Sequence, residues 1–332
     1  MRIAINGFGR IGRVLFRLLS DIKDIEVVAI NDLGSPDVLT HLLKYDSVHR
    51  GINKEVILEN NILIVGTQKT QFLSEKNPED LPWSKLNIDV VVESTGMFLT
   101  STLAKMHIKA GAKRVILSAP PKSTDIPMVV MGINHQNVTS EDLIISNASC
   151  TTNCAAPMVQ VMDKFFDIES AYITTVHSYT GDQRLHDRPH KDFRRARAGA
   201  VSIVPTTTGA AKAVTKLFPH LELGGCGIRV PVPDGSLTDI SFVVKEKITP
   251  QEVNEVFKNA AEQELKGILS YITDPIVSND IIGNPFSCIF DSELTSVVGK
   301  MVKIVGWYDN EMGYSNRLID LLYHTKSLLA SE

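Results

Sequence analysis

The 332-residue sequence contains few cysteines, and four thiols are too few for a fold held together by a disulfide framework. It has no large excess of charge of either sign, because 34 Lys and Arg residues stand against 38 Asp and Glu residues, a formal net charge of −4. This charge gives no electrostatic reason to expect nucleic acid or a membrane surface as a primary partner. The sequence also lacks any apolar run of the roughly 18–20 residues that a membrane helix needs.

What is present is the composition of an ordinary globular protein, with 43% hydrophobic and 22% charged residues. The first ten residues, "MRIAINGFGR", leave no room for a basic segment followed by an apolar one, so we expect no secretory signal. With so few cysteines, this favours a cytoplasmic protein. The length is that of two domains.

The first 32 residues have the pattern of a dinucleotide-binding unit. A short apolar run at 2–5 suits a buried strand, and Gly7, Gly9 and Gly12 follow it in the spacing G-x-G-x-x-G. An amphipathic helical stretch and a second apolar run come next, and the second run ends at Asp32. In such a unit, the glycines permit a tight turn, a close approach to a pyrophosphate and close packing of helix on strand. The start of the helix offers free N–H groups to the phosphates.

Asp32 can accept hydrogen bonds from both hydroxyls of an adenosine ribose and would repel a 2′-phosphate, which favours NAD over NADP. Further apolar runs at 88–94 and 114–119 predict an extended parallel sheet. Ligands bind beyond the carboxyl ends of such strands. The residues expected on that side are Asn31, Asp32, Thr95, Gly96 and Ser118.

The stretch "SNASCTTNC" at 146–154 places Cys150 near the start of a predicted helix. Two interpretations are open: an inert thiol, or a nucleophile whose pKa the helix N-terminus lowers. A nucleophilic thiol usually has a histidine partner, and His177, at the end of a β-branched run, is the candidate. We expect Cys154, one turn further on, to be a buried core thiol. A zinc site is disfavoured, because no second Cys/His pair completes four ligands, so no metal is expected.

Five segments together resemble phosphorylating glyceraldehyde-3-phosphate dehydrogenase of the bacterial type. They are "INGFGRIGR", "SNASCTTNC", "TTVHSYTGDQRLHDRPHKDFRRARAGAVSIVPTTTGAAKAV", "IRVP" and "VGWYDNEMGYSNR". The resemblance implies an α/β fold, with a Rossmann NAD-binding domain at 1–149 and an α+β catalytic domain at 150–312. The catalytic domain would carry a mostly antiparallel sheet, and a C-terminal helix at 313–332 would pack back on the first domain.

The resemblance also implies a chemistry of glycolysis and gluconeogenesis. Cys150 would attack the aldehyde of glyceraldehyde 3-phosphate, with His177 as base, and inorganic phosphate would cleave the resulting thioester to give 1,3-bisphosphoglycerate. The residues that match the substrate-phosphate site are Thr180, Asp182 and Arg229. Those that match the inorganic-phosphate site are Ser149, Thr151, Arg195, Thr208 and Gly209.

For the cofactor, the resemblance adds contacts from the glycine loop and from the far end of the chain. The cofactor-binding residues it implies are Gly7, Phe8, Gly9, Arg10, Ile11, Gly12, Asn31, Asp32, Lys76, Thr95, Gly96, Ser118, Asn310 and Tyr314. Asn310 would fix the nicotinamide carboxamide. The loop at about 178–201 would lie at the core of a homotetramer.

One departure from the resemblance concerns Arg188, where bacterial NAD-dependent relatives commonly carry Leu. The resemblance implies that this position approaches the adenosine ribose of a neighbouring subunit. A guanidinium there could compensate a 2′-phosphate, which predicts partial tolerance of NADP; the alternative is that Arg188 points to solvent. Two rival functions remain open: erythrose-4-phosphate dehydrogenase, and a non-catalytic Rossmann binding module that touches RNA. The basic run at 192–198 alone could suggest RNA, but the net charge is negative.

Overall fold

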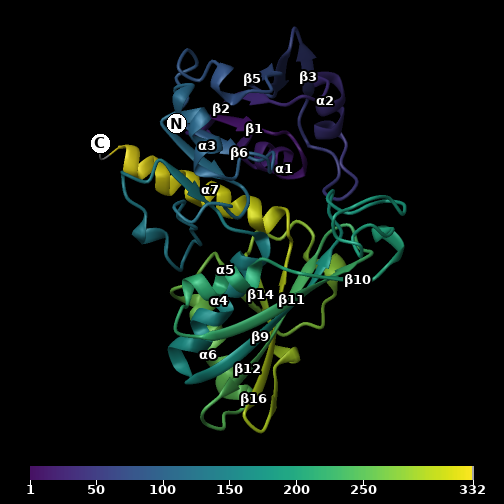
Figure 1. The fold of residues 1–332 in the computed structure, drawn as a ribbon, viewed down its shortest axis with the longest axis vertical. Helices are drawn as coiled ribbons and strands as arrows, with labels where there is room; N and C mark the ends of the chain where they lie inside the picture. The colour runs from purple at the N-terminus through teal and green to yellow at the C-terminus, as the bar shows by residue number, and fades with distance from the viewer. Residues whose placement is uncertain (331–332) are drawn as a thin grey trace. The chain divides into compact units, whose positions relative to one another are not determined.

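The computed structural model describes residues 1–330, and the chain divides into two compact units, each considered by itself. Unit 1 comprises Met1–Val129, His135–Ala148 and the segment that starts at Ser315. Unit 2 comprises Val130–Asn134 and Ser149–Tyr314. Figure 1 traces both along the chain. No described helix is long and apolar enough to cross a membrane.

Unit 1 is built on an eight-stranded sheet in the order β3-β4-β5-β2-β1-β6-β7-β8. Its strands are β1 Arg2–Asn6, β2 Glu26–Asn31, β3 Val56–Glu59, β4 Ile62–Val65, β5 Gln68–Leu73, β6 Val90–Glu93, β7 Arg114–Leu117 and β8 Ile144–Ser146. From β5 to β8, neighbouring strands are parallel. The predicted parallel sheet is therefore confirmed, and its central strands are apolar because both faces are covered.

The antiparallel hairpins β3-β4 and β4-β5 at one edge of this sheet were not predicted. Asn60 and Asn61, both with positive φ (49° and 62°), make the first turn, and Gly66, with φ 59°, makes the second. Paired asparagines and a glycine are strong turn residues because they tolerate left-handed backbone. This local signal was present in the sequence.

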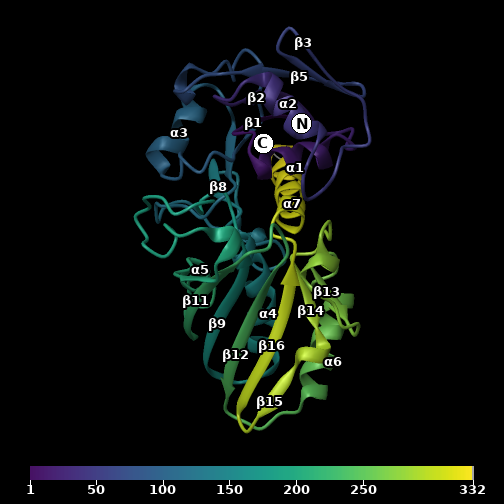
Figure 2. The same ribbon diagram turned by 90° about the vertical axis from the view of Figure 1, so that its right-hand side faces the viewer.

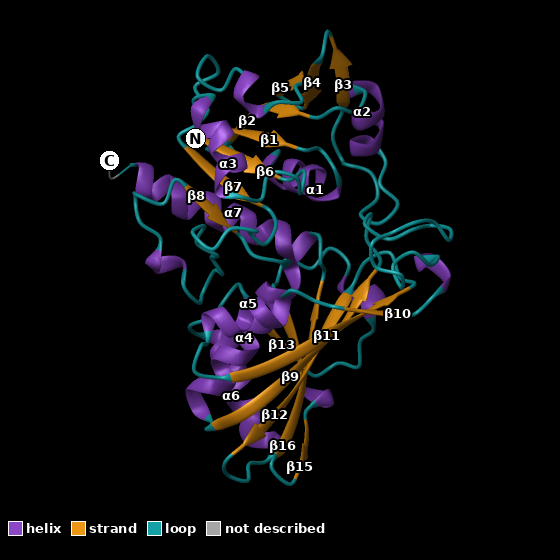
Figure 3. Cartoon of the chain, viewed as in Figure 1, coloured by secondary structure: helices purple, strands orange, loops and turns teal. Residues whose placement is uncertain are grey.

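Helices cover the sheet of unit 1 (Figure 3). They are α1 Arg10–Leu19, α2 Pro36–Lys44, α3 Ser101–Lys109 and α7 Met312–Leu329. From Ser315 onward, α7 belongs to unit 1, where Leu318, Leu321 and Leu322 are fully buried. Asp24 binds this helix by accepting hydrogen bonds from Lys326 (2.7 Å) and Tyr323 (2.9 Å).

Unit 2 is a mixed sheet in the order β10-β11-β9-β12-β16-β14-β13, with β15 paired to β16. Its strands are β9 Ile168–Ser178, β10 Val204–Thr206, β11 Glu222–Val230, β12 Ser236–Val244, β13 Leu269–Ile272, β14 Cys288–Asp291, β15 Ser296–Val298 and β16 Met301–Tyr308. The pairs β9-β11 and β13-β14 are parallel and the others antiparallel. This confirms the expected mostly antiparallel sheet.

Three helices pack against this sheet (Figure 2). They are α4 Cys150–Phe165, α5 Ala210–Leu217 and α6 Pro250–Glu262. A capping box of Thr249 and Glu252 opens α6. Short 3-10 turns in the two units are η1 Pro78–Asp80, η2 His135–Asn137, η3 Gly199–Val201, η4 Ser278–Ile281 and η5 Ser292–Leu294.

Helix α4 comes unusually close to strand β16 at Gly306. A Cβ atom there would lie 2.6 Å from Sγ of Cys288 and 2.7 Å from Sδ of Met158. Cys154 is fully buried beside them and its thiol contacts the Gly306 carbonyl at 3.7 Å, so the prediction of a core thiol is confirmed. Glycine is needed here for close packing, which seats the start of α4 against the sheet.

We predict that Gly306→Ala destabilises the protein by about 1–3 kcal/mol, because the added methyl overpacks a close-packed core. Thermal or urea unfolding of the cofactor-free protein measures this. Gly181→Ala is the matched control, since a Cβ at Gly181 meets no atom within 4 Å. Equal unfolding midpoints for the two variants would contradict the prediction.

Candidate active site

The structure brings Cys150 and His177 together in unit 2. Cys150 is the first residue of α4, and His177 lies near the end of β9. Sγ of Cys150 is 3.4 Å from Nε2 of His177, within the range of a hydrogen bond to sulfur. Ser149 caps the helix by accepting from the Thr152 N–H at 3.0 Å. The preceding Ala148 has φ +55°, a strained value for alanine that sequence reasoning missed.

The second ring nitrogen of His177, Nδ1, contacts Arg229 and the backbone of Ser178. Nδ1 lies 2.8 Å from the carbonyl oxygen of Ser178 and 2.8 Å from Nη1 of Arg229. Arg229 stands opposite His177 in the β9-β11 register and also donates to the Ser178 carbonyl at 3.0 Å. Because the Arg229 guanidinium only donates, Nδ1 can carry the imidazole proton only when both Nδ1 and Arg229 donate to the Ser178 carbonyl. Nε2 is then free to accept a proton from the Cys150 thiol.

Burial controls the protonation of this pair. It raises the pKa of Cys150 to about 11, although Arg229 and the Thr151 N–H act in the opposite direction. Burial, together with Arg229, lowers the pKa of His177 to about 3. The prediction that the helix start lowers the thiol pKa is therefore wrong in net direction, because desolvation outweighs the helix N–H groups. Cys150 depends on an adjacent base, and His177 is the group within reach.

Three of the residues predicted for the two phosphate sites, Asp182, Arg195 and Arg229, lie in one polar cluster. Arg195 donates to Asp182 at 2.5 Å, to Thr206 Oγ1 at 3.0 Å and to the Thr207 carbonyl at 3.3 Å. Arg229 is half-buried near Cys150, Arg195 and Asp182, and the charges of these three groups affect its pKa. Asp182, predicted for one site, is thus bound to Arg195, predicted for the other.

The remaining predicted phosphate-site residues lie at helix starts and turns. Thr208 accepts from the Ala210 N–H at 3.2 Å, and Gly209 is the N-cap of α5. The Thr180 backbone forms a turn with Gln183. Thr151 is different: its hydroxyl contacts Tyr308 Oη at 2.9 Å and is buried. The contacts with Tyr308 and Asp182 join distant segments and have no signal in the sequence.

Unit 1 holds a pocket of about 310 Å³ at the carboxyl ends of β1, β2 and β6. The predicted residues that line it are Gly7, Gly9, Asn31, Asp32, Lys76 and Thr95. Sequence reasoning missed Asn6, Leu33, Glu75, Pro78, Ser94, Met97 and Phe98, which also line it. Asn6 directly follows the apolar part of β1, a position that could have identified it.

Several predicted cofactor residues are not in the pocket lining. Phe8 is buried against Phe16, and only its N–H is directed to Asp32, at 2.7 Å. Arg10 pairs with Asp46 at 2.6 Å. The others outside the lining of this unit 1 pocket are Ile11, Gly12, Gly96, Ser118, Asn310 and Tyr314. The Asn310 Oδ1 atom, in unit 2, accepts hydrogen bonds from Ser178 and Ser236.

The lining of this pocket fits a dinucleotide. A Cβ at Gly7 would lie 2.7 Å from the Thr95 nitrogen, and one at Gly12 would lie 2.3 Å from the Gly7 oxygen, so both positions need glycine. At Gly9, no atom lies within 4 Å of such a Cβ, which leaves the backbone open to a ligand. The Asp32 oxygens accept from the Phe8 and Gly34 N–H groups and keep further acceptor positions.

Comparison with known proteins agrees with this geometry. Residues 1–101 match the model "Glyceraldehyde 3-phosphate dehydrogenase, NAD binding domain", and residues 149–310 match the C-terminal domain model of the same family. The chain belongs to the glyceraldehyde 3-phosphate dehydrogenase family. The predicted resemblance and two-domain α/β architecture are confirmed, and NAD is the cofactor that the matched domain binds.

Relatives within this family are similar along almost the whole chain. The protein is 54% identical to glyceraldehyde-3-phosphate dehydrogenase of Thermotoga maritima, over 97% of this chain and 98% of the relative. It is 52% identical to glyceraldehyde-3-phosphate dehydrogenase 2 of Streptomyces avermitilis, over 97% of each chain. It is 50% identical to the Geobacillus stearothermophilus enzyme, over 98% of each chain.

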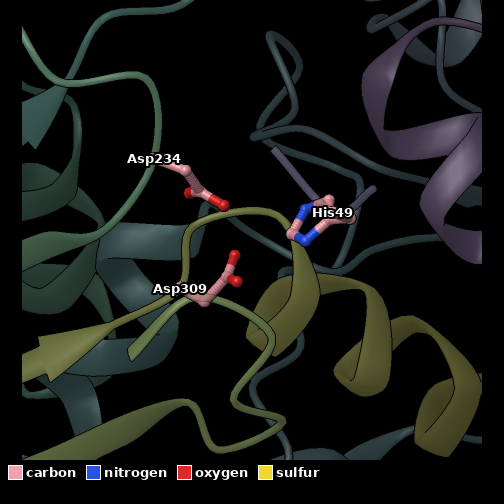
Figure 4. A group of neighbouring side chains, drawn as sticks. All are labelled: His49, Asp234 and Asp309. Atoms are coloured by element: carbon pink, nitrogen blue, oxygen red, sulfur yellow. The ribbon is translucent and has the colours of Figure 1, made fainter. Parts of the chain in front are cut away.

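A buried pair of carboxyl groups, Asp234 and Asp309, was not predicted (Figure 4). Burial, with Asp309 and Glu311 nearby, raises the pKa of Asp234 to about 9. Asp309 accepts from the N–H groups of Gly283, Glu311 and Met312 at 2.7–2.9 Å. Asp309 thus holds the loop before α7, while Asp234 stays protonated at neutral pH.

We predict that Asp234→Asn flattens the pH dependence of stability. The pKa of Asp234 lies near 9 when folded and near 3.8 in the ordinary carboxyl, so the folded state binds more protons between these values. Wild-type stability therefore falls as pH rises through this window, and the neutral amide removes that fall. Thermal unfolding at pH 5 and pH 8.5 measures the difference. Asp309→Asn is the contrasting control, expected to destabilise at both values; an unchanged pH slope in Asp234→Asn would refute the assignment.

Proposed function

We propose that this protein is a phosphorylating glyceraldehyde-3-phosphate dehydrogenase, which converts glyceraldehyde 3-phosphate, NAD and inorganic phosphate to 1,3-bisphosphoglycerate and NADH. The single observation that carries the proposal is the 3.4 Å contact between Sγ of Cys150 and Nε2 of His177. A thiol with a base in reach is the constellation that covalent catalysis on an aldehyde requires. The family match supports the same chemistry.

In this mechanism, Sγ of Cys150 bonds to the aldehyde carbon while its proton passes to Nε2 of His177. Protonated His177 gives this proton to the carbonyl oxygen, which becomes the hydroxyl of a hemithioacetal. The neutral His177 then accepts the hydroxyl proton as the carbon is oxidised. NAD, when bound, supplies the hydride acceptor. The product on Cys150 is a thioester. An inorganic phosphate oxygen then bonds to its carbon, the C–S bond breaks, and the leaving thiolate takes the proton held by His177 to return the thiol.

Both phosphate groups need cationic and hydroxyl partners. We assign Arg229, Thr180 and Asp182 to the substrate phosphate, because Arg229 is half-buried beside the Cys150–His177 pair. We assign Arg195, Ser149, Thr151, Thr208 and Gly209 to inorganic phosphate. The Arg195 contacts with the segment before α5 support this group. Here Asp182 orients Arg195 through its ion pair.

For NAD, we assign the pyrophosphate to Gly7, Phe8, Gly9, Arg10, Ile11 and Gly12, the turn that leads into α1, where the positive end of the helix dipole favours an anion. Asp32 and Asn31 would bind the adenosine end, with Lys76, Thr95, Gly96 and Ser118 along the strand ends. Asn310 would fix the nicotinamide carboxamide, because Ser178 and Ser236 occupy its oxygen at 2.8 and 2.7 Å and direct its NH₂ group outward. Tyr314 lies four residues further along.

We further propose a cytoplasmic homotetramer in which the NAD-binding domain is 1–149 and the catalytic domain is 150–312. The C-terminal segment 313–332, whose last two residues lie outside the described residues, is assigned to the NAD-binding domain. The loop at 178–201 and the residues after it expose large apolar side chains, among them Leu185 (74%), Phe193 (89%) and Ile203 (69%). Such a surface is typical of a protein contact rather than of a face that stays in water.

We predict that NADH production from glyceraldehyde 3-phosphate, followed at 340 nm, requires inorganic phosphate and is abolished in Cys150→Ser. The serine variant keeps the shape of the site but loses the soft nucleophile. Binding of NAD to this variant controls for folding. Equal sustained turnover without phosphate would mean that water resolves the thioester, and the assignment of Arg195 and Thr208 would be wrong. No turnover from a folded, NAD-binding wild type would favour erythrose-4-phosphate oxidation or a binding module.

We predict partial use of NADP through Arg188, whose backbone N–H is fixed by the Ala196 carbonyl at 2.9 Å. The guanidinium would offset repulsion between Asp32 and a 2′-phosphate. The ratio of kcat/KM for NAD and NADP measures this, with Arg188→Leu as the matched variant, in which the ratio should rise. A wild-type preference for NAD above about a thousandfold, roughly 4 kcal/mol, would contradict the prediction.

A further inference from the structure

Glu93, the last residue of β6, is fully buried and does not line the unit 1 pocket. Its carboxyl group accepts hydrogen bonds from the N–H and hydroxyl of Thr95, from Nδ2 of Asn6 and from Nε2 of His107. A buried carboxyl group of this kind needs every acceptor position filled. Two of its partners, Thr95 and Asn6, do line the pocket.

From Asn6, the hydrogen bonds continue to Asn31 at the end of β2 and then to the backbone of Glu75. Both residues line the same pocket. The Asn6 Oδ1 atom accepts from Nδ2 of Asn31 at 2.7 Å. Asn31 Nδ2 also donates to the Glu75 carbonyl at 2.9 Å, and Asn31 Oδ1 accepts from the Glu75 N–H at 2.8 Å. We call the series Glu93, Asn6, Asn31 and the Glu75 backbone the amide chain.

The amide chain has a direction that is fixed at both ends. An ionised carboxyl group only accepts, whereas an asparagine side chain has one donor end and one acceptor end. Glu93 therefore requires Asn6 to present Nδ2, which directs the Asn6 oxygen to Asn31. At the far end, the Glu75 N–H and C=O cannot exchange roles. Reversing any member places two donors or two acceptors face to face.

A second pair fixes Glu93 from its other side. The indole Nε1–H of Trp83 donates to Nδ1 of His107 at 3.0 Å, and both side chains are fully buried. Since an indole nitrogen only donates, Nδ1 is an acceptor and the imidazole proton is on Nε2. The Nε2–H group is 3.1 Å from Glu93 and donates to it. His107 is thus a further obligatory donor to Oε2 of Glu93, the oxygen that also accepts from Asn6.

We propose that Glu93 is a positioning residue for NAD: through Thr95 and the amide chain it holds the four segments that line the cofactor pocket, and the donor–acceptor direction of the chain sets NAD affinity. The inference rests on NAD as the cofactor of the proposed function. Since direction matters rather than the location of the charge, exchanging the acid and the amide between positions 93 and 6 preserves binding.

The test compares Glu93→Gln, Asn6→Asp and the double variant. In E93Q, the glutamine NH₂ group meets the donors of Asn6 and His107 or those of Thr95. In N6D, two carboxyl groups face each other. In the double variant, glutamine donates to Asp at position 6, whose second oxygen accepts from Asn31. His107 Nε2, 3.5 Å from Asn6 Nδ2, keeps an acceptor there.

We expect each single variant to raise the Kd for NAD at least tenfold and the double variant to restore it to within threefold of wild type. Calorimetric titration of NAD into the cofactor-free full chain measures Kd, and thermal unfolding reports folding. Trp83→Phe is the matched control, because it removes one buried hydrogen bond without reversing the chain; we expect a change below threefold.

Single variants that bind NAD as wild type does, or a double variant no better than the weaker single, would overturn the inference. So would a Trp83→Phe effect as large as that of E93Q, since general destabilisation would then explain both. If a single variant does not fold, the double variant still tests the inference, because its Kd for NAD must lie within threefold of the wild-type value. A wild type that does not bind NAD would overturn this inference and the proposed function together. NAD binding with rescue but no substrate oxidation would overturn the proposed function alone.

Discussion

The contact between Sγ of Cys150 and Nε2 of His177 requires the first residue of α4 to meet the end of β9. That meeting depends on how deeply α4 can sit on the sheet of unit 2. Gly306, which has no side chain, lets Met158 and Cys154 of the helix approach strand β16. Ser149 caps the start of the helix, so that Cys150 is its first residue. Packing in the core thus sets the position of Cys150, the proposed nucleophile.

The same burial that positions the pair also works against its charges. Desolvation raises the pKa of the thiol and lowers that of the imidazole, so each charged form alone is disfavoured. A proton moved from Cys150 to His177 creates both charges side by side, where they stabilise each other. Arg229 stabilises the thiolate and would itself be balanced by a bound phosphate. The site is therefore best suited to an anionic substrate.

The sequence permits strong predictions where the signal is local or repeated along the chain. Gly7, Gly9 and Gly12 between two apolar runs indicated the dinucleotide pocket, and the small polar stretch around Cys150 indicated the nucleophile. The family resemblance then supplied partners distant in sequence. The contacts of Thr151 with Tyr308 and of Arg195 with Asp182 could not be predicted from the sequence. Each joins two positions whose spacing along the chain follows neither a helical nor a strand period. The pKa of Cys150 was mispredicted for a related reason: desolvation depends on the whole surrounding fold.

Two buried carboxyl groups show how differently a fold can accommodate such a group. Asp234 faces another acid and remains protonated, so its environment tolerates a neutral amide in the same shape. Glu93 faces only donors, and each of those donors is committed elsewhere: Asn6 to Asn31, and His107 to Trp83. A neutral amide there has no orientation that satisfies its neighbours. Both side chains are buried, but they differ in what can replace them. Asp234 can be replaced by its amide, whereas Glu93 depends on the direction of every hydrogen bond around it.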